Sequence, residues 1–159
     1  MSLLVEVCVD SVESAHAAAV GGAARVELCD DLLEGGTTPS AGMIEVVRER
    51  IAIGLNVLIR PRGGDFSYSD LEFEVMERDI DVARRLGADG VVLGLLDPDG
   101  SIDEPRTRLL ADSARPLSVT FHRAFDVTRD AVESLEALIR VGVDRVLTSG
   151  RARTALDGI

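Results

Sequence analysis

Two short stretches near the N-terminus repeat the same order of acid and thiol. VEVCVD contains Glu6 and Cys8, and VELCDD contains Glu27 and Cys29, each pair lying two residues apart in an apolar run. Residues two apart in a strand point to the same face, so each glutamate shares a face with a cysteine. Thiolates bind soft metals, and carboxylates can transfer protons or hold a divalent ion. The repeat therefore raises two kinds of chemistry, metal binding and acid–base catalysis.

Later apolar runs add basic, imidazole and hydroxyl groups by the same alternation. LNVLIR places Arg60 opposite Val57 and Ile59, LSVTFHR places His122 opposite its apolar residues, and RVLTSG contributes Ser149. The ordinary pKa of a histidine such as His122 lies near neutral pH. The candidate catalytic residues are Glu6, Glu27, Arg60 and His122, and the candidate metal ligands are Cys8, Cys29 and His122.

The segments that follow these runs hold further candidates for ligand binding. PRGGDFSY, after Arg60, is long for such a connection, offers glycine N–H groups, and places Asp65 within reach of Arg60 or Arg62. Asp126, four residues after His122, would either orient the imidazole or cap the next helix. The candidate ligand-binding residues are Glu34, Arg62, Gly63, Gly64, Asp65, Arg123, Asp126 and Ser149.

Each candidate also has a purely structural interpretation. A buried free cysteine commonly behaves as a small apolar residue. Glu6 and Glu27 could simply neutralise Arg60 and Arg123 inside the fold. The residue types alone leave both interpretations open.

The composition limits the classes of partner. The 159 residues include 17 Lys and Arg and 28 Asp and Glu, for a formal net charge of −11, and no basic block occurs. Nucleic acids and anionic membranes both require basic surfaces, so we expect neither as a partner. The N-terminus lacks a basic segment followed by a long apolar stretch, and no run reaches membrane-spanning length. We expect a soluble, cytoplasmic protein that binds a small ligand or a cation.

Strands and helices are predicted to alternate along the whole chain. Short helix-to-strand links and longer, polar strand-to-helix links indicate one functional face, as in a (β/α) barrel. The predicted fold class is α/β, a TIM-type (β/α) barrel, with an open doubly wound sheet as the alternative. The polar strand faces favour the barrel, because helices covering both faces of a sheet would bury them. The predicted strands are residues 3–9, 25–30, 55–60, 90–96, 117–123 and 145–150, and a last helix is expected to begin within 151–159.

Several long motifs resemble successive signatures of the CutC family, named for a role in copper homeostasis. They are EVCVDS, GGAARVELCDDLLEGGTTPS, LIRPRGGDFSYSDLEFEVM, GADGVVLG, DGSID, LSVTFHRAFDV and GVDRVLTSG. The resemblance implies a (β/α) barrel, a bound copper ion, a cytoplasmic location and a homo-oligomer. Because an eight-stranded barrel usually needs about 250 residues, we expect residues 1–159 to form one barrel domain lacking its last two or so βα units.

Two functions are therefore carried forward. The first is copper homeostasis through copper binding, which the resemblance implies. The second is a (β/α)-barrel enzyme acting on a small polar or phosphorylated metabolite with a Glu, Arg and His pocket at the carboxyl ends of the strands. Thiols open to a shared cavity favour copper, and thiols buried beneath charged groups favour an enzyme or a scaffold.

Overall fold

The computed structural model describes residues 3–159 and contains one sheet of six parallel strands. The strands lie side by side in chain order, and each pairs in parallel with the next. Consecutive order means that every crossover runs in the same direction, whereas a doubly wound sheet reverses direction at a switch point. The strands are β1 (Glu6–Val9), β2 (Arg25–Leu28), β3 (Gly54–Leu58), β4 (Gly90–Leu93), β5 (Ser118–Phe121) and β6 (Arg145–Val146).

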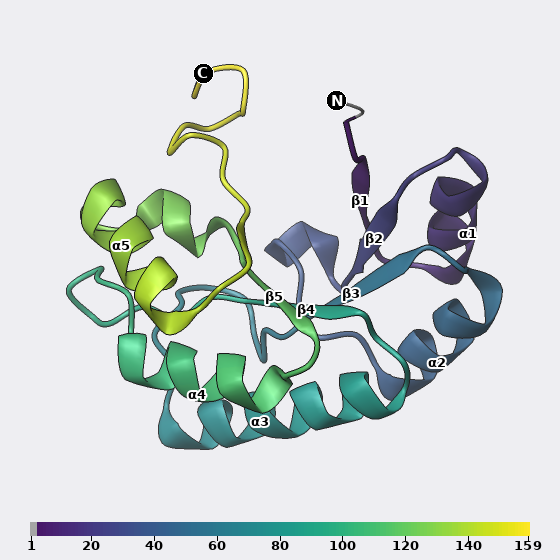
Figure 1. Ribbon diagram of the computed structural model, residues 1–159, viewed down its shortest axis with the longest axis horizontal. Helices are drawn as coiled ribbons and strands as arrows, with labels where there is room; N and C mark the ends of the chain where they lie inside the picture. Colours follow the sequence, from purple (N-terminus) through teal and green to yellow (C-terminus); the bar gives the residue numbers. More distant parts are fainter. Residues whose placement is uncertain (1–2) are drawn as a thin grey trace.

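The helices cover the outer face of this curved sheet (Figure 1). In that view they follow one another around the right, bottom and left of the strands, and the two chain ends lie at the open side. This arrangement is part of a (β/α) barrel, so the predicted fold class is confirmed. The helices are α1 (Val12–Val20), α2 (Ala41–Arg50), α3 (Asp70–Arg85), α4 (Glu104–Ala114) and α5 (Ala131–Val141), with short 3₁₀ turns η1 (Leu32–Glu34) and η2 (Arg123–Val127).

Local sequence sets the helix starts. Ser40 accepts a hydrogen bond from the backbone N–H of Met43 and so caps α2. At α3 a capping box forms, because the side chains of Ser69 and Glu72 each accept a hydrogen bond from the other's backbone N–H. These caps fix the points at which the connections from β2 and β3 end.

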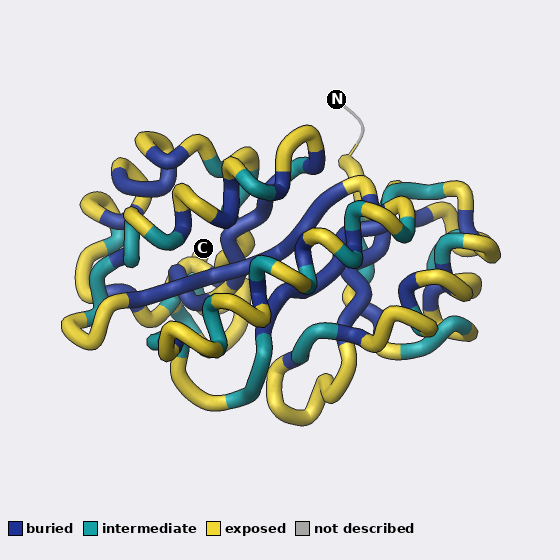
Figure 2. Tube along the Cα trace, turned by 90° about the horizontal axis from the view of Figure 1, so that it is seen from below, coloured by how far each residue is buried: buried dark blue, intermediate teal, exposed yellow. Residues whose placement is uncertain are grey.

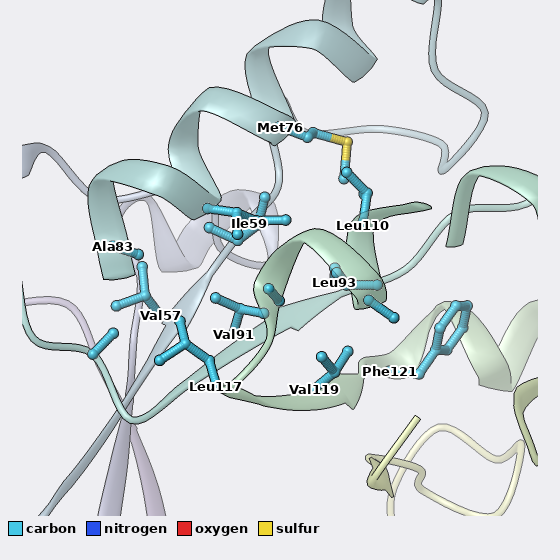
Figure 3. Close-up of a cluster of buried hydrophobic side chains, with 14 of the residues drawn as sticks. Val57, Ile59, Met76, Ala83, Val91, Leu93, Leu110, Leu117, Val119 and Phe121 are labelled. Carbon is cyan, nitrogen blue, oxygen red and sulfur yellow. The ribbon is translucent and has the colours of Figure 1, made fainter. Parts of the chain in front are cut away.

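The apolar core lies between the outer face of the sheet and the helices. Figure 2 shows the strands as the buried centre and the outward sides of the helices as exposed. In Figure 3, Val91 and Leu93 of β4 and Val119 of β5 belong to one cluster with Met76 of α3 and Leu110 of α4; all five are fully buried. The alternate residues of the strands face inward, where polar side chains such as Thr120 lie beside a small apolar cluster of Cys29, Leu58 and Val92.

Two predicted boundaries at the C-terminal end are wrong. Strand β6 contains only Arg145 and Val146 rather than residues 145–150, and residues 151–159 form turns instead of a helix. The reason for the early end of β6 is that Asp126 binds the backbone N–H of Ser149, which takes the chain away from β5.

Candidate functional site

The inner face of the sheet carries a cavity of about 700 Å³. Small-molecule sites commonly have volumes of roughly 300–1,000 Å³, so this one has room for a metabolite. The candidates from the sequence that line it are Glu6, Cys8, Glu27, Glu34, Arg60, His122 and Arg123.

The two thiols are neighbours on this face. Their sulfur atoms lie 3.7 Å apart, and both cysteines are free. Cys8 is exposed on the edge strand β1 and lines the cavity, whereas Cys29 is buried directly after β2 against Leu58 and Val92. The Cys29 thiol donates to the carbonyl oxygen of Val9 at 3.5 Å. The pair can therefore be reached from the cavity through the sulfur of Cys8.

The contact between the sulfurs changes how the thiols ionise. The hydrogen bond with Cys29 raises the pKa of Cys8, and the surrounding protein and the Glu27 carboxylate act in the same direction. The same hydrogen bond lowers the pKa of Cys29. The first thiolate is thus favoured at Cys29, with Cys8 as the donor that stabilises it.

Glu27 is a buried carboxyl with no cationic partner within the described residues. Its side chain accepts only a weak hydrogen bond, from the Cys8 thiol at 3.8 Å, and the residue is 8% exposed. Burial, followed by the negative charge of Glu6, raises its pKa to about 7, while the Cys8 bond acts in the opposite direction. A carboxyl that titrates near neutral pH can accept or donate a proton.

Glu6 has a different environment from Glu27. It forms an ion pair with Arg25 on the neighbouring strand β2, and its Oε1 accepts from the Asn56 amide at 3.3 Å. The β1–β2 register puts Glu6 directly beside Arg25. The expectation that Glu6 and Glu27 neutralise Arg60 and Arg123 is therefore wrong. The strand register places Arg25 beside Glu6, and it places no cation beside Glu27.

Arg60 holds two loops together at the mouth of the cavity. Its guanidinium donates to the carbonyl oxygens of Glu34 at 2.9 Å, Gly36 at 2.8 Å and Gly64 at 2.9 Å. It also lies over the Phe66 ring, 5.0 Å from the ring centre. Most of its donors are thus used to position the loops that follow β2 and β3.

His122 is held as a neutral imidazole. Its Nδ1 accepts from the backbone N–H of Ala124 at 3.1 Å, so the ring proton belongs on Nε2, which is buried and has no partner within residues 3–159. Burial, and then the charge of Arg60, lower its pKa to about 3. The expectation that His122 titrates near neutral pH is therefore wrong. Gly94 on β4's continuation makes room for the ring, because a Cβ there would lie only 2.5 Å from Nδ1.

The predicted ligand-binding residues of the loop after β3 do not line the cavity, although Phe66 of the same loop does. Arg62, Gly63, Gly64 and Asp65 are all outside the cavity lining. Arg62 forms ion pairs with Asp65 at 3.0 Å and with Glu72 at 2.5 Å. Two acids within its own loop and the next helix thus neutralise this arginine, which leaves no free clamp for an anion.

Asp126 has neither of the roles predicted for it, since Asp130 caps α5 and Asp126 forms no contact with the imidazole. Its carboxylate accepts from the Thr148 hydroxyl at 2.5 Å, from the Ser149 hydroxyl at 2.9 Å and from Arg123 at 2.9 Å. Burial alone would raise its pKa, but the hydrogen bonds outweigh burial and the net shift is downward. Arg123, Asp126 and Ser149 therefore form one cluster that fastens the segment after β6.

Two basic residues of the cavity wall are absent from the set predicted from sequence. Arg25 and Arg145 are the first residues of β2 and β6, and both line the cavity. Arg25 is two residues before Glu27 and Arg145 is four residues before Ser149, so the strand alternation places each on the inward face. Applying that alternation from the first residue of each strand would have identified both. Phe66 also lines the cavity, but it lies in a loop where no period applies.

The predicted three-residue metal site does not assemble. Within residues 3–159, no three His, Cys, Asp or Glu side chains gather closely enough to hold a metal ion together. His122 is accordingly not a third ligand to the two thiols. Among the described helices, none is both long and apolar enough to cross a bilayer.

Parallel strands in consecutive order, helices on the outside and a polar cavity on the inside define a protein of the (β/α)-barrel class. Within this class, a model of the CutC family matches residues 3–159, and the chain belongs to that family. The resemblance noted in the sequence is thereby confirmed.

Individual relatives agree with this assignment. A CutC family protein of Chromobacterium violaceum is 54% identical over 158 residues, which cover 99% of this chain and 64% of the relative. The mouse copper homeostasis protein cutC homolog is 56% identical over 156 residues, which cover 98% of this chain and 57% of the relative. The chain thus spans about three fifths of the length of these relatives.

Solved structures support the fold in the same way. The crystal structure of a copper homeostasis protein CutC from Streptococcus agalactiae matches with a TM-score of 0.89 and 38% identity, covering 96% of this chain and 75% of that one. A 2,3-dimethylmalate lyase of the PEP mutase/isocitrate lyase superfamily matches with a TM-score of 0.65 at 14% identity, over 92% of this chain and 57% of that one. The second likeness concerns the fold alone.

Proposed function

We propose that the chain binds one Cu(I) ion between Cys8 and Cys29 and serves in copper homeostasis. The observation that carries the proposal is the 3.7 Å separation of the two sulfur atoms, with Cys8 open to the cavity. Relatives named for copper homeostasis add support at the level of the family.

The chemistry of the two thiols fits Cu(I). Cu(I) is a soft ion that prefers sulfur ligands and accepts as few as two of them. Within the described residues, no three His, Cys, Asp or Glu side chains gather closely enough to share one metal ion, which disfavours ions that need a fuller shell, such as Zn²⁺. Binding displaces the thiol protons, so affinity increases with pH.

Competition with a colorimetric Cu(I) chelator, under anaerobic and reducing conditions, tests the proposal. We expect the wild-type chain to take one Cu(I) from the chelator, and Cys8→Ser and Cys29→Ser each to lose most of that affinity. His16→Asn, a change at an exposed helix residue, is the matched control and should bind as the wild type does. Full Cu(I) affinity in the double serine variant would remove the proposal.

The size and charge of the cavity favour a second candidate, a (β/α)-barrel enzyme acting on a small polar or phosphorylated metabolite. A volume of about 700 Å³ far exceeds that of a metal ion, and carboxyl and guanidinium groups line it. A thermal-shift screen of metabolites on the wild type and on Glu27→Gln tests this candidate. A metabolite that is bound by both and turned over only by the wild type would support it, and no hit in the screen would count against it.

Three further expectations from the sequence are part of the proposal. We propose that residues 1–159 belong to a single barrel domain, that the chain forms a homo-oligomer, and that it acts in the cytoplasm. Light scattering coupled to size exclusion tests the oligomer, and a monomer would contradict it.

A further inference from the structure

The inner face of β5 and β6 holds an arginine that has only neutral partners. Arg145 is half-buried, lines the cavity and lies beside Thr120 in the strand register. Its Nε donates to Thr120 Oγ1 at 3.1 Å, and its Nη2 donates to Ser118 Oγ at 2.6 Å. These two hydroxyls fix the guanidinium in the cavity wall without balancing its charge.

The other arginines of the cavity have less to offer a ligand. Arg25 and Arg123 each form an ion pair with a carboxylate. Arg60 uses both Nη atoms on three backbone carbonyls, and its one unpartnered donor, Nε, is buried. Within residues 3–159, Arg145 forms no ion pair, and its Nη1 makes no hydrogen bond. Arg145 therefore keeps a charge and a donor that a ligand could use.

The position of Ser118 beside Arg145 depends on a glycine. A Cβ at Gly90 would overlap both Ser118 Oγ and Asn56 Oδ1. Asn56 in turn donates to Glu6 Oε1 at 3.3 Å. A layer of polar groups thus crosses the inner face from β1 to β6, and Arg145 stands at one end of it.

We propose that Arg145 binds the anionic group, a carboxylate or a phosphate, of a small molecule that occupies the cavity. The free Nη1 carries N–H donors beside a charge that no carboxylate balances, and guanidinium donors form strong hydrogen bonds with the oxygens of either group. The chain as a whole carries a net charge of −11, so attraction of an anion must come from this local site and not from the general field. The proposal goes beyond copper binding, because it uses neither thiol.

Calorimetric titration with inorganic phosphate and with succinate, each compared with sodium chloride at equal ionic strength, tests the proposal. We expect at least one of the two anions to bind the wild type, and the one that binds identifies the group as phosphate or carboxylate. Arg145→Gln should weaken that binding by about tenfold or more, as expected for loss of a hydrogen bond to a charged group. Arg78→Gln removes the same charge from the exposed face of α3 and should bind as the wild type does.

Equal affinity in Arg145→Gln and Arg78→Gln, or no binding by the wild type beyond that of chloride, would overturn the proposal. If Arg145→Gln does not fold, the NMR signal of the Arg145 Nε–H group in the wild type decides. It should shift when the anion is added, and an unchanged signal would contradict the proposal. Cys8→Ser should retain anion binding and Arg145→Gln should retain Cu(I), so the two proposals can fail separately.

Discussion

Replacing Gly94 by alanine should distort the position of His122. The added Cβ would lie 2.5 Å from the imidazole Nδ1 and closer still to Cε1, whereas ordinary contacts begin at 3.4 Å, so the ring must move by at least about 0.9 Å (3.4 − 2.5). The ring is packed beside Phe66 and Phe121, with centroid distances of 5.0 and 6.0 Å, and its Nδ1 accepts a hydrogen bond. Overpacking costs about 1–3 kcal/mol and a lost hydrogen bond about 1 kcal/mol. We expect Gly94→Ala to lower the free energy of unfolding by roughly 2–4 kcal/mol.

Urea unfolding followed by far-UV circular dichroism measures this change in a chain without tryptophan. The matched control is Gly42→Ala in α2, where a Cβ meets nothing within 4 Å. That change should stabilise the chain by about 0.5 kcal/mol, because alanine restricts the unfolded state more than glycine does.

A double-mutant cycle tests the stated cause. In a His122→Ala background the clash is absent, so Gly94→Ala should there cost less than about 1 kcal/mol. The same cost for Gly94→Ala with and without the ring would refute the steric argument.

Three other predictions concern buried acids and the imidazole. Because the pKa of His122 is lowered from 6.5 to about 3, the unfolded chain gains a proton below pH 6.5 that the folded chain does not. Between pH 7 and pH 5 this difference lowers the free energy of unfolding, so the stability of the wild type relative to His122→Asn, measured in urea, should fall over that range; an unchanged difference would contradict this. The effect of Glu27 on stability has the opposite sign, since its pKa is raised from 4.5 to about 7. Glu27→Gln should therefore increase the free energy of unfolding at pH 8 by roughly 3 kcal/mol and change it little near pH 4.5. A destabilised variant at pH 8 would count against this explanation. Asp126→Asn should speed hydrogen exchange at the amides of Ser149 and Arg151, which donate to this carboxylate, and unchanged exchange would show that other contacts hold the segment.

The fold was largely predictable because it depends on periods that the sequence displays. Val119 and Phe121 alternate with Ser118 and Thr120, and the structure buries the first pair beneath helices and turns the second pair inward. The capping pair at the start of α3 likewise follows from residue type and spacing alone. Periodicity did not distinguish a barrel from a doubly wound sheet. The polar faces of the strands and the CutC-like motifs favoured the barrel.

The pairing of side chains was less predictable, because it depends on strand register and loop geometry. Sequence parity places Glu6 on the inner face, but only the register shows that Arg25 lies beside it. The partners of Arg60 are backbone carbonyls of two loops, which no residue pattern specifies. In the same way, the contacts of Asp126 with the segment after β6 shorten that strand against its β propensity.

The most direct test of the central claim is X-ray absorption spectroscopy at the copper edge on the chain loaded with one Cu(I) ion. Binding between Cys8 and Cys29 predicts a first shell of two sulfur atoms without nitrogen, and loss of one sulfur in Cys29→Ser. A first shell of nitrogen or oxygen atoms in the wild type, or an unchanged shell in Cys29→Ser, would contradict the assignment.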